Sequence, residues 1–181
     1  MILDYIATKI HQIRHKEQLH VSSRTVLPRN ALLRIASNAK IEIGNNTVFR
    51  SDLILNASDG GIIIIGDRVF FNDRCCLNSR KCITIGDDTI IGQNVLFYDH
   101  DHDYRKGPIK KKTSYRVGEI CIGSRVWIGS NVVILKGTTI GDNSVIAAGC
   151  VVRGNVPANT LLYPATEMKM KNIQEYCYET S

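Results

Sequence analysis

Two histidines set among aspartates are the densest group of chemically active side chains in this chain. Residues 97–119 include His100 and His102, with Asp99, Asp101 and Asp103 beside and between them. An imidazole with an unperturbed pKa of about 6.5 can take a proton from a hydroxyl group at neutral pH, so either histidine could act as a general base. The pair could instead bind zinc together with a third histidine or a carboxylate. Alternatively, both rings could simply form hydrogen bonds within a polar loop, and the residue types alone leave these three roles open.

The six cysteines are the other candidate reactive groups, and their spacing does not favour such a role. They contain no CxxC pair and no disulfide framework, and none is paired with a histidine in the sequence. The first residues carry Asp4 and Lys9 within an apolar stretch, which is not typical of a signal peptide. We therefore expect a cytoplasmic protein with reduced, structural thiols at Cys75, Cys76, Cys82, Cys121, Cys150 and Cys177.

The elements that must position these groups are short strands repeated every six residues. From Ile122 onward an aliphatic residue recurs at strict steps of six, and the position four residues after each one is small or β-branched. Upstream, Ile-Gly pairs that begin at residues 43, 65, 85 and 91 open similar units. A period of six scatters aliphatic residues around an α-helix, so the pattern predicts strands. The two columns are Ile122, Ile128, Ile134, Ile140, Ile146 and Val152, and Val126, Val132, Thr138, Ser144, Cys150 and Val156.

This repeat predicts an all-β fold in one domain, a parallel β-helix. Each hexapeptide supplies a strand whose aliphatic side chain points inward, and a turn where glycine or a small polar residue adopts unusual dihedral angles. Three such sides close one coil, and successive coils pair through parallel backbone hydrogen bonds. We assign residues 41–165 to the β-helix, 1–40 to an N-terminal helical arm, 97–119 to a protruding loop that interrupts the period, and 166–181 to a short C-terminal helix.

The N-terminal arm carries an amphipathic stripe and most of the excess positive charge. Leu3, Ile6, Ile10 and Ile13 recur at helical spacing, and we expect this stripe to pack over the solenoid or a neighbouring subunit. Residues 1–40 hold seven basic and two acidic side chains, a large share of the net charge of +6. No basic face interleaved with aromatic residues appears, so nucleic acid is not an expected partner. Peripheral contact of the arm with a membrane is the alternative role for the stripe.

The repeat resembles that of a known enzyme family. The runs Ile122-Gly-Ser-Arg-Val-Trp127-Ile-Gly-Ser130-Asn-Val-Val and Ile140-Gly-Asp-Asn-Ser-Val-Ile-Ala-Ala148-Gly are similar to those of the bacterial hexapeptide-repeat acetyltransferases. That family includes the galactoside and maltose O-acetyltransferases and their polysaccharide-modifying relatives. The resemblance covers residues 41–165 and implies a left-handed parallel β-helix. It also implies a homotrimer that moves an acetyl group from acetyl-CoA, without a metal, to a sugar hydroxyl in capsule or O-antigen biosynthesis.

The resemblance also assigns roles around the acceptor. In the family, a histidine at the start of the extended loop is the catalytic base. His102 matches that histidine, and His100, two residues earlier, is an accessory or fallback candidate. Asn72 matches a family asparagine that binds the acceptor. The expected partner carboxylate is missing, because residues 78–80 read Asn-Ser-Arg, and this departure indicates a sugar other than a galactoside or maltose.

A second set of residues matches the coenzyme site of the family, which lies in a groove between adjacent subunits. Trp127 and Ser130 match positions beside that groove, and the Ser130 backbone amide is a candidate donor to an oxyanion. Ala148 matches a position that meets the pantetheine amides. Arg153 and Lys169 could contact the CoA phosphates.

Other functions stay open at the level of sequence. The same base and thioester chemistry would serve N-acetylation of an amino sugar or another small acceptor. A zinc enzyme of the γ-carbonic anhydrase kind shares the coil but needs three histidine ligands, whereas the coil region has two. A non-catalytic solenoid is the last alternative, and the charged histidine loop argues against it.

Overall fold

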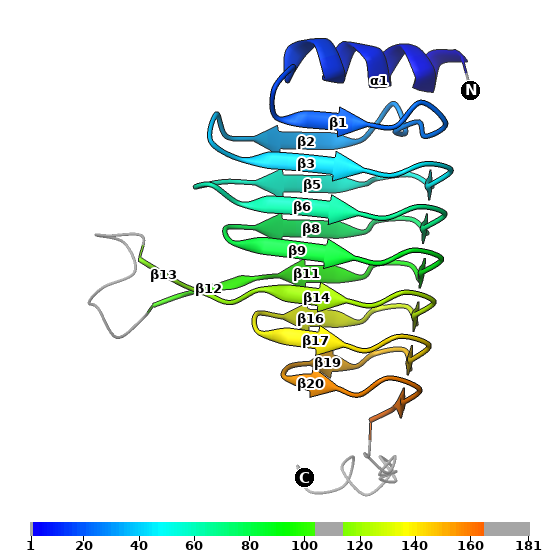
Figure 1. Ribbon diagram of the computed structural model, residues 1–181, viewed down its shortest axis with the longest axis vertical. Coiled ribbons are helices and arrows are strands. Elements are labelled where there is room, and N and C mark those ends of the chain that lie inside the picture. Colours follow the sequence, from blue (N-terminus) through cyan, green and yellow to red (C-terminus); the bar gives the residue numbers. More distant parts are fainter. Residues whose placement is uncertain (1, 104–113, 165–181) are drawn as a thin grey trace, which may run out of the picture.

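Short strands wind into a parallel β-helix of about six turns, with one helix at its N-terminal end (Figure 1). This computed structural model describes residues 2–103 and 114–164. The fold confirms the solenoid expected from the hexapeptide repeat. The C-terminal helix predicted over 166–181 and the coenzyme candidate Lys169 lie outside the described residues.

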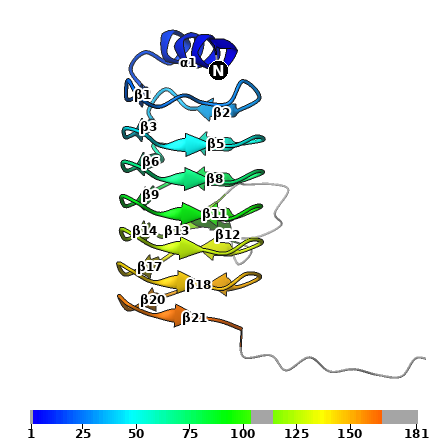
Figure 2. The ribbon, with the colours of Figure 1, turned by 90° about the vertical axis from the view of Figure 1, so that its right-hand side faces the viewer.

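Three sheets form the sides of the solenoid, and the chain visits them in turn within each coil (Figure 2). The first sheet contains β1 (Leu19–Val21), β3 (Lys40–Ile43), β6 (Ile62–Ile65), β9 (Cys82–Ile85), β14 (Ile120–Ile122), β17 (Thr138–Ile140) and β20 (Asn155–Val156). The second contains β4 (Val48–Phe49), β7 (Phe70–Phe71), β10 (Ile90–Ile91), β15 (Trp127–Ile128), β18 (Val145–Ile146) and β21 (Leu161–Leu162). The third contains β2 (Leu32–Ile35), β5 (Ile54–Ala57), β8 (Cys76–Ser79), β11 (Leu96–Tyr98), β16 (Val133–Leu135) and β19 (Val151–Val152).

Side chains from all three sheets fill the interior, and both columns of the repeat point inward. Every residue from Ile122 to Val152 in the aliphatic column is buried, as is every residue from Val126 to Val156 in the second column. Burial of each large aliphatic side chain is worth about 1.5–3 kcal/mol. Hydroxyl groups at the corners are satisfied as well: Thr47 Oγ1 donates to the Gly66 carbonyl and accepts from the Val69 amide.

The glycines that follow the aliphatic column are predicted to adopt unusual dihedral angles in the turns, but the structure shows a different reason for them. Gly86 does not have a positive φ, but a Cβ on it would lie 2.6 Å from the Gly123 carbonyl carbon of the next coil. The left-handed conformation occurs two residues later, at Asp88 (φ 57°) and Arg125 (φ 56°). Glycine is therefore needed because adjacent coils approach closely, whereas the unusual dihedral angle belongs to a non-glycine residue of the turn.

The β-helix begins earlier than residue 41, which corrects the predicted boundary of the arm. Within residues 1–40, α1 (Ile2–Arg14) is the helical part, and β1 and β2 already belong to the first coil. β1 pairs with β3 in the register Leu19 to Ile41, and β2 pairs with β5. This first coil lacks the Ile-Gly signature, and a three-residue strand with two buried side chains is too short to produce a recognisable period.

α1 lies across the end of the solenoid (Figure 1), and its polar face is the one that contacts the first coil, so the expected packing of the apolar stripe over its own solenoid is wrong, while packing on a neighbouring subunit stays a prediction. Thr8 Oγ1 accepts from the Leu27 amide, and Gln12 Nε2 donates to the Val21 carbonyl. Leu3, Ile6, Ile10 and Ile13 are exposed on the opposite face. Over residues 2–103 and 114–164, no helix combines the length and apolar character that a membrane span requires.

The predicted loop is a β-hairpin at its base. After β11 the chain leaves the coil, forms β12 (His100–His102), and returns through β13 (Tyr115–Val117), which pairs antiparallel with β12. Figure 1 shows this hairpin projecting from the side of the solenoid. The interruption of the six-residue period therefore marks a true excursion from the coil.

Replacement of Gly86 by alanine tests the close-approach explanation. We expect Gly86→Ala to lower the free energy of unfolding by about 1–3 kcal/mol, because the new methyl group would overlap the backbone of the next coil. Thr139→Ala, on the exposed outer face of β17, is the control and should change stability little. Urea unfolding followed by circular dichroism measures both variants, and an unchanged midpoint for Gly86→Ala would refute the explanation.

Candidate active site

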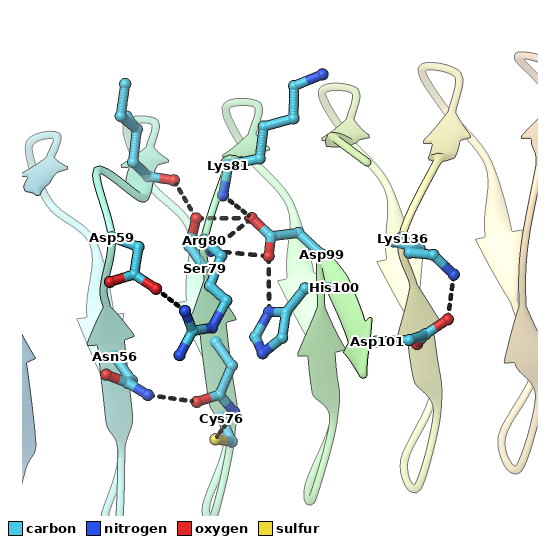
Figure 3. Close-up of polar contacts among 12 residues, drawn as sticks. Asn56, Asp59, Cys76, Ser79, Arg80, Lys81, Asp99, His100, Asp101 and Lys136 are labelled. Carbon is cyan, nitrogen blue, oxygen red and sulfur yellow. Dashed lines mark hydrogen bonds and ion pairs between the residues drawn. The ribbon is translucent and has the colours of Figure 1, made fainter. Parts of the chain in front are cut away.

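A buried carboxylate occupies the corner at which the hairpin leaves the coil. Asp99 follows β11 directly and is fully buried. Its Oδ2 accepts hydrogen bonds from Ser79 Oγ at 2.8 Å and from the Lys81 amide at 2.8 Å, and its Oδ1 accepts from the Arg80 amide at 2.8 Å. The carboxylate therefore satisfies backbone amides of the coil above at the point where the solenoid is interrupted (Figure 3).

The same carboxylate holds the ring of His100. Asp99 Oδ1 lies 2.9 Å from His100 Nδ1, and the His100 side chain is only 18% exposed. Burial by itself raises the pKa of Asp99, but the hydrogen bonds from His100, Arg80, Lys81 and Ser79 outweigh this effect and lower it. Because an ionised carboxylate can only accept, this contact favours the tautomer with the proton on Nδ1, which leaves Nε2 as a proton acceptor.

His102 is held less firmly than His100. It is exposed, and its ring centroid lies 4.7 Å from that of Tyr115. Among the described residues its ring contacts Tyr115 but forms no hydrogen bond. Both histidines lie on the same face of β12, since alternate residues of a strand point the same way. The structure thus brings both candidate bases to one place, and only His100 contacts a carboxylate there.

Asp101 does not orient either imidazole. It forms an ion pair with Lys136, which lies between β16 and β17, and its Oδ2 is 3.5 Å from Arg153 Nη2. These contacts anchor the hairpin to the coils below it and lower the pKa of Asp101. Arg153, predicted to contact the CoA phosphates, is therefore placed beside the hairpin.

Two residues beside His100 were not singled out as site residues by the sequence. The Tyr115 ring lies edge-on to His100, with the ring centroids 5.3 Å apart. The Arg80 guanidinium lies 3.6 Å from the Tyr115 ring centroid and forms an ion pair with Asp59. Asn56 and Asn78 continue this polar surface along the third sheet, where Asn56 Nδ2 donates to Asn78 Oδ1 at 2.9 Å. No short motif connects these residues, because they come from different coils.

A groove on the second sheet collects four of the predicted residues. Asn72, Trp127, Ser130 and Ala148 line a cavity of about 550 Å³. Trp127 is 56% exposed, and its outward neighbours along the sheet are all apolar. They stand in register on adjacent strands: Phe70, Ile90, Trp127, Val145 and Leu161. The groove is thus mainly apolar on its sheet side and edged by the turns that carry Asn72, Ser130 and Ala148.

The groove and the histidines lie on different sides of the chain. The groove lies on the second sheet, whereas the hairpin leaves the solenoid between the third sheet and the first. In a three-sided coil this corner is opposite the second sheet. One chain therefore presents two separate surfaces with different chemistry.

The five cysteines within the described residues show no sign of an activated nucleophile. Cys75, Cys76, Cys82, Cys121 and Cys150 are free, and burial raises the pKa of Cys75 to about 11. Burial also raises the pKa of Cys76, Cys82 and Cys150. The described residues include no group of three His, Cys, Asp or Glu side chains that could hold a metal ion.

The fold and these two surfaces define a class, the β-helical acyltransferases, and comparison with known proteins identifies the family. A family model described as "Bacterial transferase hexapeptide (six repeats)" matches residues 122–154. WbbJ of Escherichia coli K12, by its name an O-acetyl transferase of lipopolysaccharide biosynthesis, is 34% identical over 154 residues, which cover 81% of this chain and 77% of WbbJ. The galactoside O-acetyltransferase of the same strain is 32% identical, with 85% of this chain and 70% of the relative covered. The chain belongs to the hexapeptide-repeat acetyltransferases.

Solved structures agree with this assignment. The hexapeptide-repeat acetyltransferase VCA0836 of Vibrio cholerae, in complex with acetyl-CoA, has a TM-score of 0.53 and 29% identity, covering 87% of this chain and 80% of VCA0836. The polySia-specific acetyltransferase NeuO has a TM-score of 0.59 and 26% identity, covering 80% and 72%. AntD of Bacillus cereus, with a TM-score of 0.70 and 18% identity, shares the fold. The protein is an acetyl-CoA-dependent acetyltransferase.

Removal of the buried charge tests the role of Asp99 at the corner. We expect Asp99→Asn to destabilise the protein by about 1–3 kcal/mol at pH 7, because its amide nitrogen would face the donors that the carboxylate accepts. The lowered pKa of Asp99 means that its stabilisation is complete above the unfolded-state pKa of about 3.9 and is lost as the pH falls through the lower folded-state value. The difference between wild type and variant should therefore shrink below pH about 4.

Urea unfolding at several pH values measures this difference. Asp52→Asn is the matched control, because Asp52 is exposed and its positive φ of 58° suits asparagine. Equal stability of Asp99→Asn and wild type at pH 7 would show that the fold does not need the negative charge of Asp99 where the hairpin leaves the coil.

Proposed function

We propose that this acetyltransferase transfers the acetyl group of acetyl-CoA to a hydroxyl of a sugar used in surface polysaccharide biosynthesis, with His100 as the general base. The observation that carries this proposal is the pairing of Asp99 with His100 Nδ1 at 2.9 Å. A ring fixed by a buried carboxylate presents Nε2 in one orientation and one tautomer. His102 has no such partner among the described residues, so we favour His100 over His102, although His102 matches the family pattern better.

The chemistry needs one proton acceptor and one leaving thiolate. The acceptor hydroxyl gives its proton to His100 Nε2 while its oxygen attacks the thioester carbonyl carbon. Collapse of the tetrahedral oxyanion breaks the carbon–sulfur bond, and the CoA thiolate takes the proton back from the imidazolium. Asp99 stabilises the imidazolium that forms between these two steps. The Ser130 backbone amide is our candidate donor to the oxyanion.

The groove on the second sheet suits the pantetheine arm of acetyl-CoA. Its floor is apolar, Trp127 offers a broad surface for the arm, and Ser130 and Ala148 lie at its edge. Pockets for ligands of this kind are mostly apolar, with a few polar groups that set orientation. Asn72 lies in the same groove, where its Oδ1 accepts from the Asp73 amide.

A complete site then requires two chains. His100 lies at the corner opposite the second sheet, so it can meet a groove only on a neighbouring subunit. Pairing of one corner with the next chain's groove is a head-to-tail contact, and such contacts close into a ring of three when each copy is rotated by one third of a turn from the last. We propose a homotrimer with three sites, each built from the groove of one subunit and the hairpin corner of another.

The acceptor surface favours a polar, ring-shaped molecule. Asn56, Asn78, Arg80 and Tyr115 surround His100 with amide, guanidinium and aromatic groups. Sugars bind through such hydrogen-bonding and stacking groups. The two relatives above carry names that refer to lipopolysaccharide biosynthesis and to galactosides, which supports a sugar acceptor.

The choice of base is tested by parallel substitution of the two histidines. We expect His100→Ala to lower kcat by about 10²- to 10⁴-fold, the usual contribution of a general base. His102→Ala should keep most of the activity, because its ring is exposed and no contact with a carboxylate holds it among the described residues. Release of free thiol from acetyl-CoA, measured with a panel of sugars, nucleotide sugars and amino sugars, gives the rates and also separates O- from N-acetylation.

The reverse result, with activity lost in His102→Ala and kept in His100→Ala, would assign the base to His102. Thiol release with amino sugars alone would show that the acceptor group is an amine and not a sugar hydroxyl. The thermal midpoint of each variant serves as the folding control.

The proposal that each site is built from two chains is tested by combining His100→Ala with a substitution in the groove. We expect Ala148→Phe to raise KM for acetyl-CoA strongly, because the ring would occupy the groove, whereas Ala158→Phe at another exposed corner should not. Hybrids assembled from equal amounts of His100→Ala and Ala148→Phe subunits should then recover activity, since about one quarter of their interfaces would pair an intact groove with an intact corner. Hybrids as inactive as either parent would place groove and base within one subunit.

A further inference from the structure

The outer face of α1 exposes five large aliphatic side chains. They recur at steps of one, three and four residues, so they form one stripe on a helix with about 3.6 residues per turn. Their exposed fractions run from 47% to 78%. Soluble proteins rarely leave a contiguous apolar surface of this kind uncovered. The stripe consists of Ile2, Leu3, Ile6, Ile10 and Ile13.

The opposite face of α1 is fixed to the solenoid by hydrogen bonds, so the helix cannot rotate to bury the stripe. Asp4 Oδ1 accepts from the Arg29 amide at 3.1 Å, Thr8 Oγ1 accepts from the Leu27 amide at 2.8 Å, and Gln12 Nε2 donates to the Val21 carbonyl at 2.9 Å. Rotation would break all three contacts, and it would leave the buried Leu27 amide without an acceptor and the Val21 carbonyl without this donor. The outward direction of the stripe is therefore a stable property of the fold.

Basic residues surround the stripe. Lys9 and Arg14 lie on the exposed flanks of α1, and further cations follow between the end of α1 and the start of β3. The 40 residues that build this end hold seven basic and two acidic side chains, a net charge of +5. Seen from outside, the N-terminal end of the solenoid is an apolar strip with a cationic border. The basic residues are Lys9, Arg14, Lys16, Arg24, Arg29, Arg34 and Lys40.

We propose that this end of the molecule docks on an anionic lipid bilayer. An interfacial helix places its aliphatic side at the boundary of headgroups and acyl chains, while lysine and arginine side chains meet the headgroup phosphates. Both features are present here on one rigid surface. A single short helix of this kind gives reversible attachment, which depends on the anionic lipids as well as on the apolar stripe.

A second copy of the chain fits this surface less well. End-to-end pairing would bring two ends, each with a net charge of +5, within a few ångströms of each other. A side-by-side ring would leave the ends of the solenoids uncovered, because α1 lies across the end of the solenoid (Figure 1) and its bonded face, with Thr8 and Gln12, is turned toward the first coil. Charge complementarity therefore favours an anionic membrane. In this orientation β11, three strands beyond β2, lies about 14 Å further from the bilayer than β2, at about 4.8 Å per strand, and His100 follows β11 at the start of β12.

Flotation with lipid vesicles tests the docking surface without any enzymatic turnover. The full chain should float with vesicles of phosphatidylcholine and phosphatidylglycerol, but not with vesicles of phosphatidylcholine alone, and high salt should release it. Ile6→Gln/Ile10→Gln should reduce the bound fraction at least tenfold without a change in net charge. The matched control Ile6→Leu/Ile10→Leu keeps the apolar stripe and should bind like wild type. Lys9→Gln/Arg14→Gln should lose several-fold affinity for the anionic vesicles only.

Thermal midpoints and thiol release without vesicles show whether these variants remain folded, because neither Ile6 nor Ile10 belongs to the active site. The proposal is overturned if wild type does not float with the anionic vesicles, or if the glutamine variant floats equally well. It is also overturned if sedimentation shows that wild type associates end to end through this stripe, while the glutamine variant does not and neither binds vesicles.

Discussion

The close stacking of successive coils is the constraint on which the rest of this molecule depends. Parallel backbone hydrogen bonds hold neighbouring strands about 4.8 Å apart, and at the glycine corners this spacing leaves no room for a Cβ atom. A Cβ on Gly44 would meet the backbone of Gly66, and one on Gly141 would meet that of Ala158. The spacing also aligns inward side chains into continuous columns, so that each coil buries the next. The strands are only two to four residues long, and no single coil could be stable alone.

An interruption of this stacking leaves backbone amides without their usual acceptors, and the corner that carries His100 supplies a replacement. Where the chain leaves the coil after β11, the amides of Arg80 and Lys81 need an acceptor other than the next strand. Asp99 supplies it with a fully buried carboxylate, and the same group then holds His100. The structural requirement and the chemical one are therefore met by a single side chain. Its other partner, Ser79, fits because it is small and carries a hydroxyl.

The sequence predicts the solenoid well, because its period follows directly from coil geometry. Ile122 to Val152 identify the inward column without any knowledge of the structure. The first coil escapes prediction, because Leu19 and Val21 offer two buried positions and no glycine. The turn geometry is misassigned for a different reason: both a positive φ and a close backbone approach favour glycine, and sequence alone does not separate them. Only the coordinates place the positive φ at Asp88 and its equivalents.

The candidate site is harder to predict than the fold, since its residues meet across coils. His100 and His102 both stand out in the sequence, and the resemblance to the family favours His102 as the base. Our preference for His100 depends instead on which ring contacts Asp99, and the sequence does not show this. Arg80 and Tyr115 lie far apart in the sequence, and they are in contact because the hairpin returns to the corner that carries Arg80.

Inward and outward positions of the solenoid carry different kinds of information. An inward residue is constrained by its neighbours in the coils on either side, so it is small or apolar and can carry little chemistry. An outward residue has no such constraint. The strand register that aligns the inward side chains also aligns the outward side chains into columns. On the second sheet that outward column is apolar, from Phe70 through Trp127 to Leu161, whereas around His100 it is polar. A thioester with an apolar arm and a sugar with many hydroxyls need surfaces of these two opposite kinds. This chain carries the two kinds of surface on different sides, and the homotrimer proposed above would bring the groove of one copy to the hairpin corner of the next.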